Sequence, residues 1–385
     1  MDKVNTHNEV WKYTPINEFR LLKFHQNNNL VKKNIQCKSN EIIMLNGCVY
    51  KIGKNIFKNN IQALNINEAN QKNIKISKKL FEKIKKSNNR IYNYDKSNLS
   101  INGLFLCIPE NTKISEPIII KHHFDNKYNQ DNILKYFYLF SIEKNVDVII
   151  INDNSSKLKN NIGLTASIDI DKNSNIEFIN ILQNSNVKQL SNFFLDINNS
   201  SVLKYHLINI TGKLLKNNFF INLNGQNSQC YFNGISISES KNHIDSYIEI
   251  DHKNQNTISD LNFKCIAKDS SKNILYAKAI IKKNSSFSEA YQKNNNLMLS
   301  EKSTIHSNPQ LEIYNNDVQC SHGSTTGELD DDAIYYMMTR GINKTDAKNL
   351  LLKGFYEEIL NKISTIDTKQ YLSNKLDSYF KNELF

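Results

Sequence analysis

Residues 308–342 read NPQLEIYNNDVQCSHGSTTGELDDDAIYYMMTRGI and carry the most informative pattern in the chain. The run LEIY at 311–314 predicts a strand, and the polar residues NND at 315–317 predict a turn. The chain is expected to become extended again at Val318 and to turn helical only after residue 330. The segment therefore predicts two strands joined by a short turn, with a helix after the second strand.

Cys320 and His322 lie two positions apart in the second of these strands, so both are expected on one face, with Ser321 on the other. A thiolate and an imidazole side by side can form half of a metal or iron–sulfur site, because a cluster normally takes four protein ligands. A second chain would then supply the other ligands. The alternative is a small buried cysteine beside an unrelated histidine, the commoner meaning of a single Cys-x-His pair.

The helix after the second strand has recognisable ends. Asp330 is a typical N-cap residue, and the acidic side chains at 331–332 complement the positive end of the helix dipole. Gly341 follows a last turn that contains Arg340, and glycine commonly terminates helices at this position. The pattern predicts a short helix between these two ends.

Several short motifs along the chain occur in an order typical of one protein family. They are PQLEI at 309–313, DV at 317–318, CSHG at 320–323, Gly327, LD at 329–330, RGI at 340–342, Gln292, NLMLS at 296–300 and EVWKYT at 9–14. Together they resemble the SufB/SufD family of iron–sulfur cluster assembly proteins, and its SufD members more than its SufB members. The resemblance is dense over the last third of the chain, and Ala277 departs from it, since a glycine is expected there.

The resemblance implies a mainly β fold, a right-handed parallel β-helix core flanked by small N-terminal and C-terminal helical regions. Residues 1–92 are expected to form a mixed helical region and 93–327 the β-helix core. Residues 328–385 are expected to form a C-terminal helical region that docks an ATPase.

Recurring polar corners support a repetitive core. They start at residues 173, 198, 226 and 254, at intervals of 25, 28 and 28 residues, which suit one turn of a β-solenoid. The corners alone would fit a β-sandwich equally well. The family resemblance favours the parallel β-helix.

The resemblance also implies a site and two partners. Cys320 and His322 would contribute to a transient iron–sulfur cluster at a subunit interface, with His322 favoured as the direct ligand and Cys320 as its neighbour or alternative. A SufB-like subunit would pair through the β-helix, and SufC, an ABC-type ATPase, would dock on the C-terminal helices. The residues expected to bind partners there are Asp330, Arg340, Gly341, Leu350, Leu351 and Phe355.

Composition excludes some other functions. The net charge is +11, but the only arginines are Arg20, Arg90 and Arg340, and the lysines are spread along the whole chain. Nucleic-acid recognition favours the planar Arg fork, so a dedicated nucleic-acid site is not expected. Six cysteines without a CxxC motif argue against a zinc ribbon and a disulfide framework.

The chain shows neither a membrane segment nor a nucleotide motif. The longest aliphatic runs, such as 148–151, are far too short to cross a bilayer, and the first residues lack an apolar signal core. Gly53-Lys54 and Gly212-Lys213 lack the spacing of a Walker motif. We expect a cytoplasmic, non-catalytic scaffold subunit whose partner hydrolyses ATP.

Two other functional classes stay open from the sequence. A β-helical carbohydrate-active enzyme would need clustered carboxylates, often with calcium, and a basic residue along one groove. A purely structural interaction protein would need neither Cys320 nor His322.

The N-terminal third and two histidine motifs give further expectations. Helices are expected over residues 16–24 and 78–86, and a hairpin is expected around Asn46-Gly47. His122 and His123 would face opposite sides of a strand and so form no metal pair. His252 is expected to make hydrogen bonds in the core or between turns of the solenoid.

Overall fold

The structure is a computed structural model, and it describes residues 9–15, 17–20, 22–24, 34–72, 74–86, 102–124, 132–155 and 161–380. Arg90 and the expected domain boundary between residues 92 and 93 lie outside these ranges. Within the described ranges, no helix combines the length and apolar character that a membrane crossing requires.

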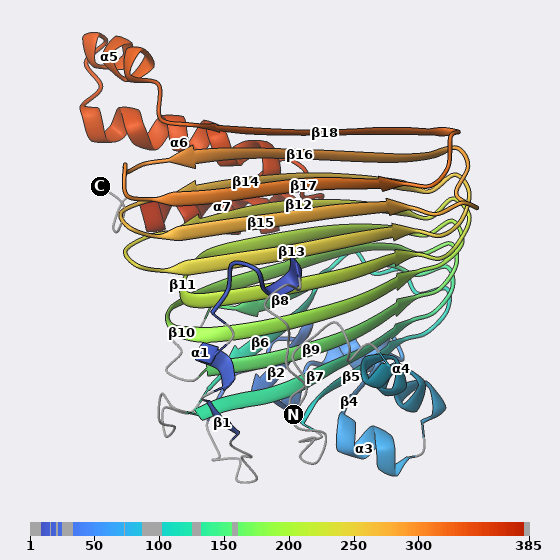
Figure 1. Cartoon of the computed structure of the whole chain (residues 1–385). Coiled ribbons are helices and arrows are strands. Elements are labelled where there is room, and N and C mark those ends of the chain that lie inside the picture. The colour runs from blue at the N-terminus through green and yellow to red at the C-terminus, as the bar shows by residue number, and fades with distance from the viewer. Residues whose placement is uncertain are drawn as a thin grey trace.

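The core is a parallel β-solenoid of about seven turns (Figure 1). The strands of the first wall are β2 (Glu41–Leu45), β6 (Ile118–His123), β8 (Asp147–Asn154), the first halves of β10 (Asn175–Ile197) and β11 (Val202–Leu223), β12 (Gln229–Ser238), β14 (Ile258–Ala267), β16 (Ser288–Met298) and β18 (Val318–Gly327). The strands of the second wall are β5 (Gly103–Ile108), β7 (Asn132–Ile142), β9 (Asn161–Ile170), the second halves of β10 and β11, β13 (His243–His252), β15 (Lys272–Ile281) and β17 (Thr304–Ile313). The prediction of a mainly β chain with a β-helix core and flanking helices is confirmed.

The solenoid interior is filled by rows of side chains in register on successive strands. Phe178, Tyr205 and Phe232 occupy one such row, with ring centroids 5.2 Å and 5.0 Å apart. Phe193 and Phe219 stack at 4.9 Å on the second wall. Because parallel in-register strands lie about 4.8 Å apart, identical rows can stack aromatic rings at each turn and exclude water.

The predicted polar corners are the turns of this solenoid. Asn145, Asn173, Ser200, Asn227 and Asn256 each have a positive φ between 54° and 58° and occupy one corner of successive turns. Their N–H groups donate to a carbonyl of the next turn, at 2.9–3.2 Å. Asparagine tolerates the left-handed conformation better than most residues, so the corner sequence suits its backbone. This stacking excludes the β-sandwich alternative.

The N-terminal third adds short elements to both walls. They are η1 (Glu9–Trp11), α1 (Asn17–Arg20), β1 (Lys23–Phe24), β3 (Cys48–Ile52), α2 (Lys54–Lys58), β4 (Gln62–Asn65), α3 (Ile66–Gln71) and α4 (Lys75–Lys86). The predicted hairpin is confirmed, because β2 pairs antiparallel with β3 through Asn46 and Gly47, both at positive φ.

The helix predicted over residues 16–24 is wrong at its C-terminal end. The helix α1 has only four residues, and Lys23–Phe24 instead form β1, which pairs parallel with β7. The edge of β7 offers unpaired backbone groups, and pairing with it outweighs local helix propensity. The second predicted helix, over residues 78–86, is confirmed within α4.

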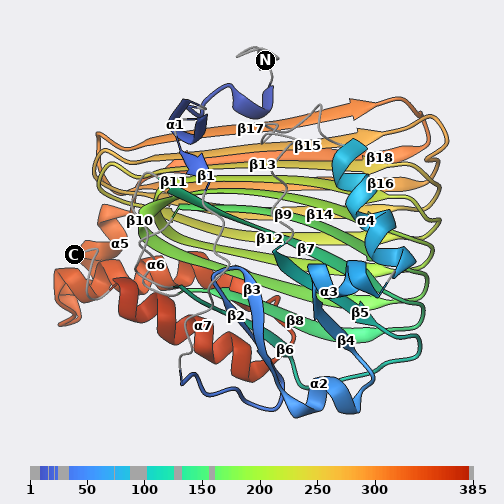
Figure 2. The same cartoon turned by 90° about the horizontal axis from the view of Figure 1, so that it is seen from below.

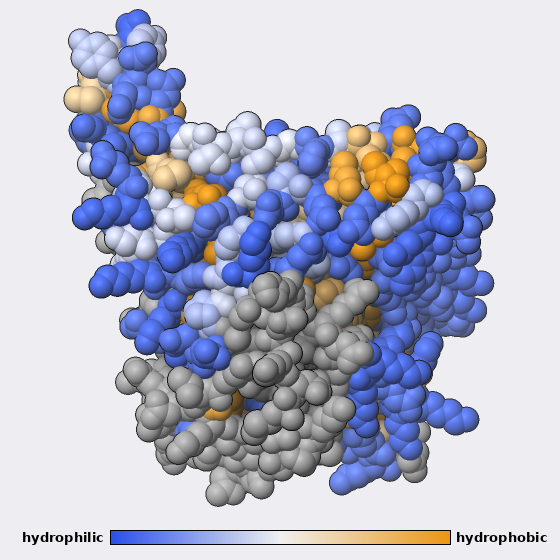
Figure 3. All heavy atoms as spheres, viewed as in Figure 1, coloured by the Kyte–Doolittle hydropathy of each residue, from blue (hydrophilic) through white to orange (hydrophobic). Residues whose placement is uncertain are grey.

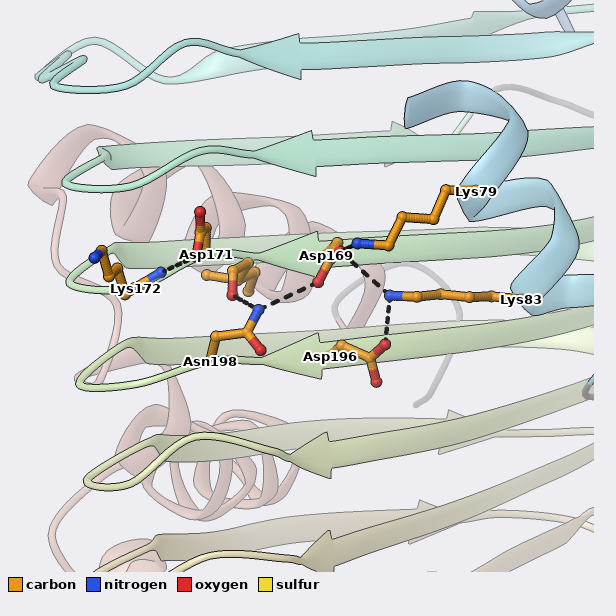
Figure 4. A network of polar contacts seen from close by, with 8 residues as sticks. Lys79, Lys83, Asp169, Asp171, Lys172, Asp196 and Asn198 are labelled. Atoms are coloured by element: carbon orange, nitrogen blue, oxygen red, sulfur yellow. Dashed lines mark hydrogen bonds and ion pairs between the residues drawn. The ribbon is translucent and has the colours of Figure 1, made fainter. Parts of the chain in front are cut away.

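Two lysines fix α4 against the outside of the second wall (Figure 4). Lys83 contacts Asp196 at 2.6 Å and Asp169 at 3.2 Å, and Lys79 contacts Asp169 at 3.7 Å. The carboxylates raise the pKa of Lys83, although burial opposes them. The helix thereby neutralises two neighbouring acids on the solenoid surface.

Residues 9–14, here called the N-terminal strap, cross the second wall. Beneath the strap, Lys216 of β11 and Asp245 of β13 form an ion pair of 2.7 Å, with side chains only 1% and 3% exposed. The Thr14 hydroxyl donates to Asp245, and the Trp11 ring lies 5.7 Å from the Lys216 ammonium. The strap therefore covers a buried charge pair.

Three C-terminal helices complete the chain: α5 (Asp331–Thr339), α6 (Lys344–Leu360) and α7 (Ile366–Tyr379). Helices α6 and α7 lie along the first wall (Figure 2). Their side chains, such as Leu352 and Leu376, pack on isoleucines of the outer face of this wall. Lys264 of β14 contacts Glu358 of α6 at 2.7 Å, and this contact lowers the pKa of Glu358 to about 2. The helix α5 instead stands off the solenoid body (Figure 1).

Candidate functional site

The last turn of the solenoid leaves the end of the fold open. Strand β17 pairs with β15, strand β18 pairs with β16, and in the described part of the chain neither has a strand on its other side. Each strand has 10 residues, so two long backbone edges stay unpaired. Exposed edges of this kind readily pair with another chain.

The two residues singled out from the sequence both lie on the inner face of β18. Cys320 is in register with Ala290 and His322 with Gln292, and both partners on β16 are buried. Ser321 is in register with Tyr291 on the outer face. The alternation predicted for Cys320, Ser321 and His322 is therefore confirmed.

Cys320 packs into an apolar cluster at the corner of the open end. Its neighbours there are Ala279, Ile281, Ala290, Leu311 and Val318. The thiol is half-buried, and burial raises its pKa. Cys320 is therefore recessed and mostly protonated near neutral pH.

His322 has a different environment although it shares the face. Its side chain is exposed, because no further strand among the described residues covers this row. The next inner position, Ser324, donates to the Ser307 hydroxyl of β17 at 2.7 Å and so links the two walls beside His322. An imidazole at an open edge can bind a metal through a neutral ring nitrogen without losing a proton.

The site is incomplete as a metal site within this chain. Among the described residues, no three His, Cys, Asp or Glu side chains gather closely enough to hold a metal ion. The open end offers one exposed imidazole and one recessed thiol. A cluster bound here needs ligands from outside these residues.

The residues predicted to bind partners on the C-terminal helices have several local roles. Asp330 caps α5 by accepting from the N–H groups of Asp332 and Ala333 at 3.0 Å and 3.1 Å. Gly341 ends the helix with φ +87°, and Arg340 lies over the Tyr336 ring at 5.3 Å.

The three apolar members of this set differ in exposure. Leu350 is 49% exposed, Leu351 is half-buried, and Phe355 packs against the first wall with Lys264 4.6 Å from its ring. Phe355 is thus largely engaged within the chain. Leu350 is available to another protein.

The structure shows exposed apolar residues on α5 that were not among the predicted site residues. Tyr335 is 70%, Tyr336 60% and Met338 44% exposed. Together with the exposed Leu350 of the next helix, α6, we call these residues the α5 patch. Figure 3 shows apolar surface on the lobe formed by α5. The sequence signal for this patch was an apolar run in a short helix that follows several acidic residues. Which face of that helix is exposed cannot be identified without the fold.

The other histidines singled out from the sequence have structural contacts. His122 accepts or donates in hydrogen bonds to Tyr138 at 2.6 Å and Asn152 at 2.9 Å, inside the solenoid. His252 contacts the hydroxyls of Thr257 and Ser259, each at 2.8 Å, and burial lowers its pKa to about 3. Both are buried structural residues, as expected for His252.

The family follows from comparison with known proteins. A family model described as "SUF system FeS cluster assembly, SufBD core domain" matches residues 128–355, more than half of the chain. The chain belongs to the SufB/SufD family. Among its members the chain is SufD-like, as the sequence motifs predict.

Relatives of this SufB/SufD chain come from diverse organisms. The iron–sulfur cluster assembly protein SufD of Escherichia coli (strain K12) is 29% identical over 165 residues, covering 43% of this chain and 39% of that protein. A SufBD family protein of Synechocystis is 30% identical over 162 residues, 42% of this chain and 36% of that protein. One from Mycobacterium leprae is 23% identical over 180 residues, 45% of this chain and 46% of that protein. The matches span about two fifths of the length of the curated relatives.

Proposed function

We propose that this chain is a SufD-like scaffold subunit of an iron–sulfur cluster assembly complex. The observation that carries the proposal is the exposed His322, held on the inner face of the uncovered last turn. The subunit is non-catalytic, has no nucleotide site of its own and works in the cytoplasm. The cluster is a transient cargo shared with a partner, and His322 supplies one of its ligands.

The partner across the open end is a SufB-like subunit. The unpaired edges of β17 and β18 place a second β-helix next to His322 if that subunit continues the two walls. Cys320 lies within two residues of the ligand but packs against the apolar corner, so its role is to shape the site. In this proposal the SufB-like subunit, and not this chain, accepts the sulfur for the cluster.

Co-expression with SufB-like and SufC-like subunits from the same source tests this assembly. Native mass spectrometry is expected to show a complex with one copy of this chain, one SufB-like subunit and bound ATPase. A chain that purifies alone under the same gentle conditions would contradict the scaffold function.

The α5 patch is the docking site for the SufC-like ATPase. Its tyrosines and methionine are exposed on a helix that projects from the solenoid, and large aromatic side chains dominate the binding energy of many interfaces. ATP-driven closure of docked ATPases would strain the subunit pair and open the interface beside His322.

Substituting the patch gives a direct prediction for ATPase binding. The double substitution Tyr335→Ala and Tyr336→Ala is expected to weaken binding by about 30-fold, or about 2 kcal/mol, measured by calorimetric titration. Ile366→Ala is the matched control, because Ile366 is 82% exposed but lies on α7, away from the patch. Equal affinity for the double variant and the control would place ATPase docking elsewhere.

The carbohydrate-active alternative is not favoured by the arrangement of acids. The acidic row on the second wall contains Asp169, Asp196 and Asp251, but Lys83 neutralises the first two and Lys282 lies 3.6 Å from the third. Acids that are paired with lysines are poorly placed to act on a polysaccharide. An assay for polysaccharide cleavage is expected to show none.

A further inference from the structure

Gln292 lies directly next to His322 in the inner row of the first wall. The two residues are register partners on β16 and β18, and Gln292 is only 6% exposed. Its side-chain N–H donates to the backbone carbonyl of Gln310 on β17, at 3.2 Å, across the interior. Because a carbonyl can only accept, this contact fixes which end of the amide faces β17.

The amide oxygen of Gln292 is left without a donor. It is buried, and within the described residues no hydrogen-bond partner reaches it. A buried acceptor without a donor destabilises the fold, so a donor is expected nearby. The neighbours in its row are Leu261, which has no polar group, and His322, which has a ring N–H.

We propose that Gln292 is a positioning residue for His322: the exposed imidazole, which does not reach the Gln292 amide oxygen in this structure, turns about its side-chain torsions so that its Nδ1–H donates to that oxygen. Nδ1 is the ring nitrogen nearer the backbone and so nearer the adjacent strand. This bond leaves the lone pair of Nε2 free at the open end of the solenoid, where a ligand from a second chain can share a metal. A partner on the far ring nitrogen is a common way to fix the tautomer of a metal-binding histidine.

The role of this hydrogen bond in orienting a metal ligand rests on the proposed function, but the hydrogen bond itself can be tested without iron. The full-length chain labelled with 15N-histidine reports the ring tautomer by long-range 1H–15N NMR, and His322→Ala identifies the signal. At pH 8 the wild-type His322 is expected to carry its proton on Nδ1, the less favoured tautomer of a free imidazole. A proton on Nε2 in the wild type would overturn the inference.

Two variants separate positioning from a general structural role. Gln292→Leu removes the acceptor, so the Nδ1–H signal of His322 is expected to be replaced by the Nε2–H form. Gln292→Glu keeps an acceptor but loses the donor to Gln310, so it is expected to retain the Nδ1–H form. Loss of that form in both variants would show that the bond to Gln310 matters instead, and would overturn the proposal.

Iron binding distinguishes failure of this inference from failure of the proposed function. In the complex with a SufB-like subunit, Gln292→Leu is expected to weaken Fe(II) binding by about 10- to 100-fold, with Gln292→Glu close to wild type. If the Nδ1–H form is present but the wild-type complex binds no Fe(II) through His322, the positioning is upheld and the scaffold function falls. If Fe(II) binds through His322 with its proton on Nε2, the scaffold function is upheld and the positioning falls.

Discussion

Replacing His322 by alanine is expected to reduce cluster formation on the assembled complex by at least about 100-fold. Removing a direct ligand should reduce cluster formation by more than the 10- to 100-fold loss that is typical of changes in the outer shell of a metal site. Iron and sulfide content per complex, together with visible absorbance, measure the result. The backbone of β18 should not change, because the His322 side chain is exposed.

Neighbouring residues on β18 provide the controls. Ser321→Ala lies on the opposite face and is expected to retain cluster formation. Cys320→Ala is expected to retain most of it, because the thiol packs in the apolar corner. A large loss in Cys320→Ala with a normal His322→Ala would make the cysteine the ligand. Full cluster formation in a variant that carries both Cys320→Ala and His322→Ala would support a purely structural protein.

The second large effect concerns the charge pair beneath the N-terminal strap. Lys216→Met is expected to lower the free energy of unfolding by about 3–5 kcal/mol, because it leaves the Asp245 carboxylate buried without its cation. Burial lowers the pKa of Lys216, and the Asp245 carboxylate opposes this effect. The charged form of Lys216 is therefore stabilised by Asp245. Urea unfolding at a fixed pH measures the change.

Matched variants separate burial from the loss of a lysine. Lys188→Met breaks a surface ion pair with Glu18, which is 49% exposed, and is expected to cost less than about 1 kcal/mol. Lys216→Met combined with Asp245→Asn is expected to recover much of the lost stability, since no unpaired charge is left. Equal losses for Lys188→Met and Lys216→Met would contradict the buried pair.

Local sequence rules predicted much of the fold and part of the site. The corner asparagines, the turn at Asn46-Gly47 and the cap at Asp330 depend on conformations of a few adjacent residues. For the same reason the shared face of Cys320 and His322 followed from strand alternation alone. The family motifs then selected the solenoid over a sandwich.

Long-range register decided what local rules could not. Lys23 and Phe24 form a strand because β7, more than a hundred residues away, offers an edge. Lys216 and Asp245 become a buried pair only because β11 and β13 are adjacent and the N-terminal strap covers them. No periodicity in the sequence reports such contacts.

The sequence by itself determined the positions of the polar turns, the two ends of helix α5 and the shared face of Cys320 and His322, because each depends on backbone preferences over a few residues. Only the tertiary structure decided that Cys320 is recessed, that His322 is exposed and that Gln292 is its neighbour. These differences depend on which strands end the solenoid and on what the opposite wall places against them. Two residues on one face of one strand thus acquire different chemistry from packing alone.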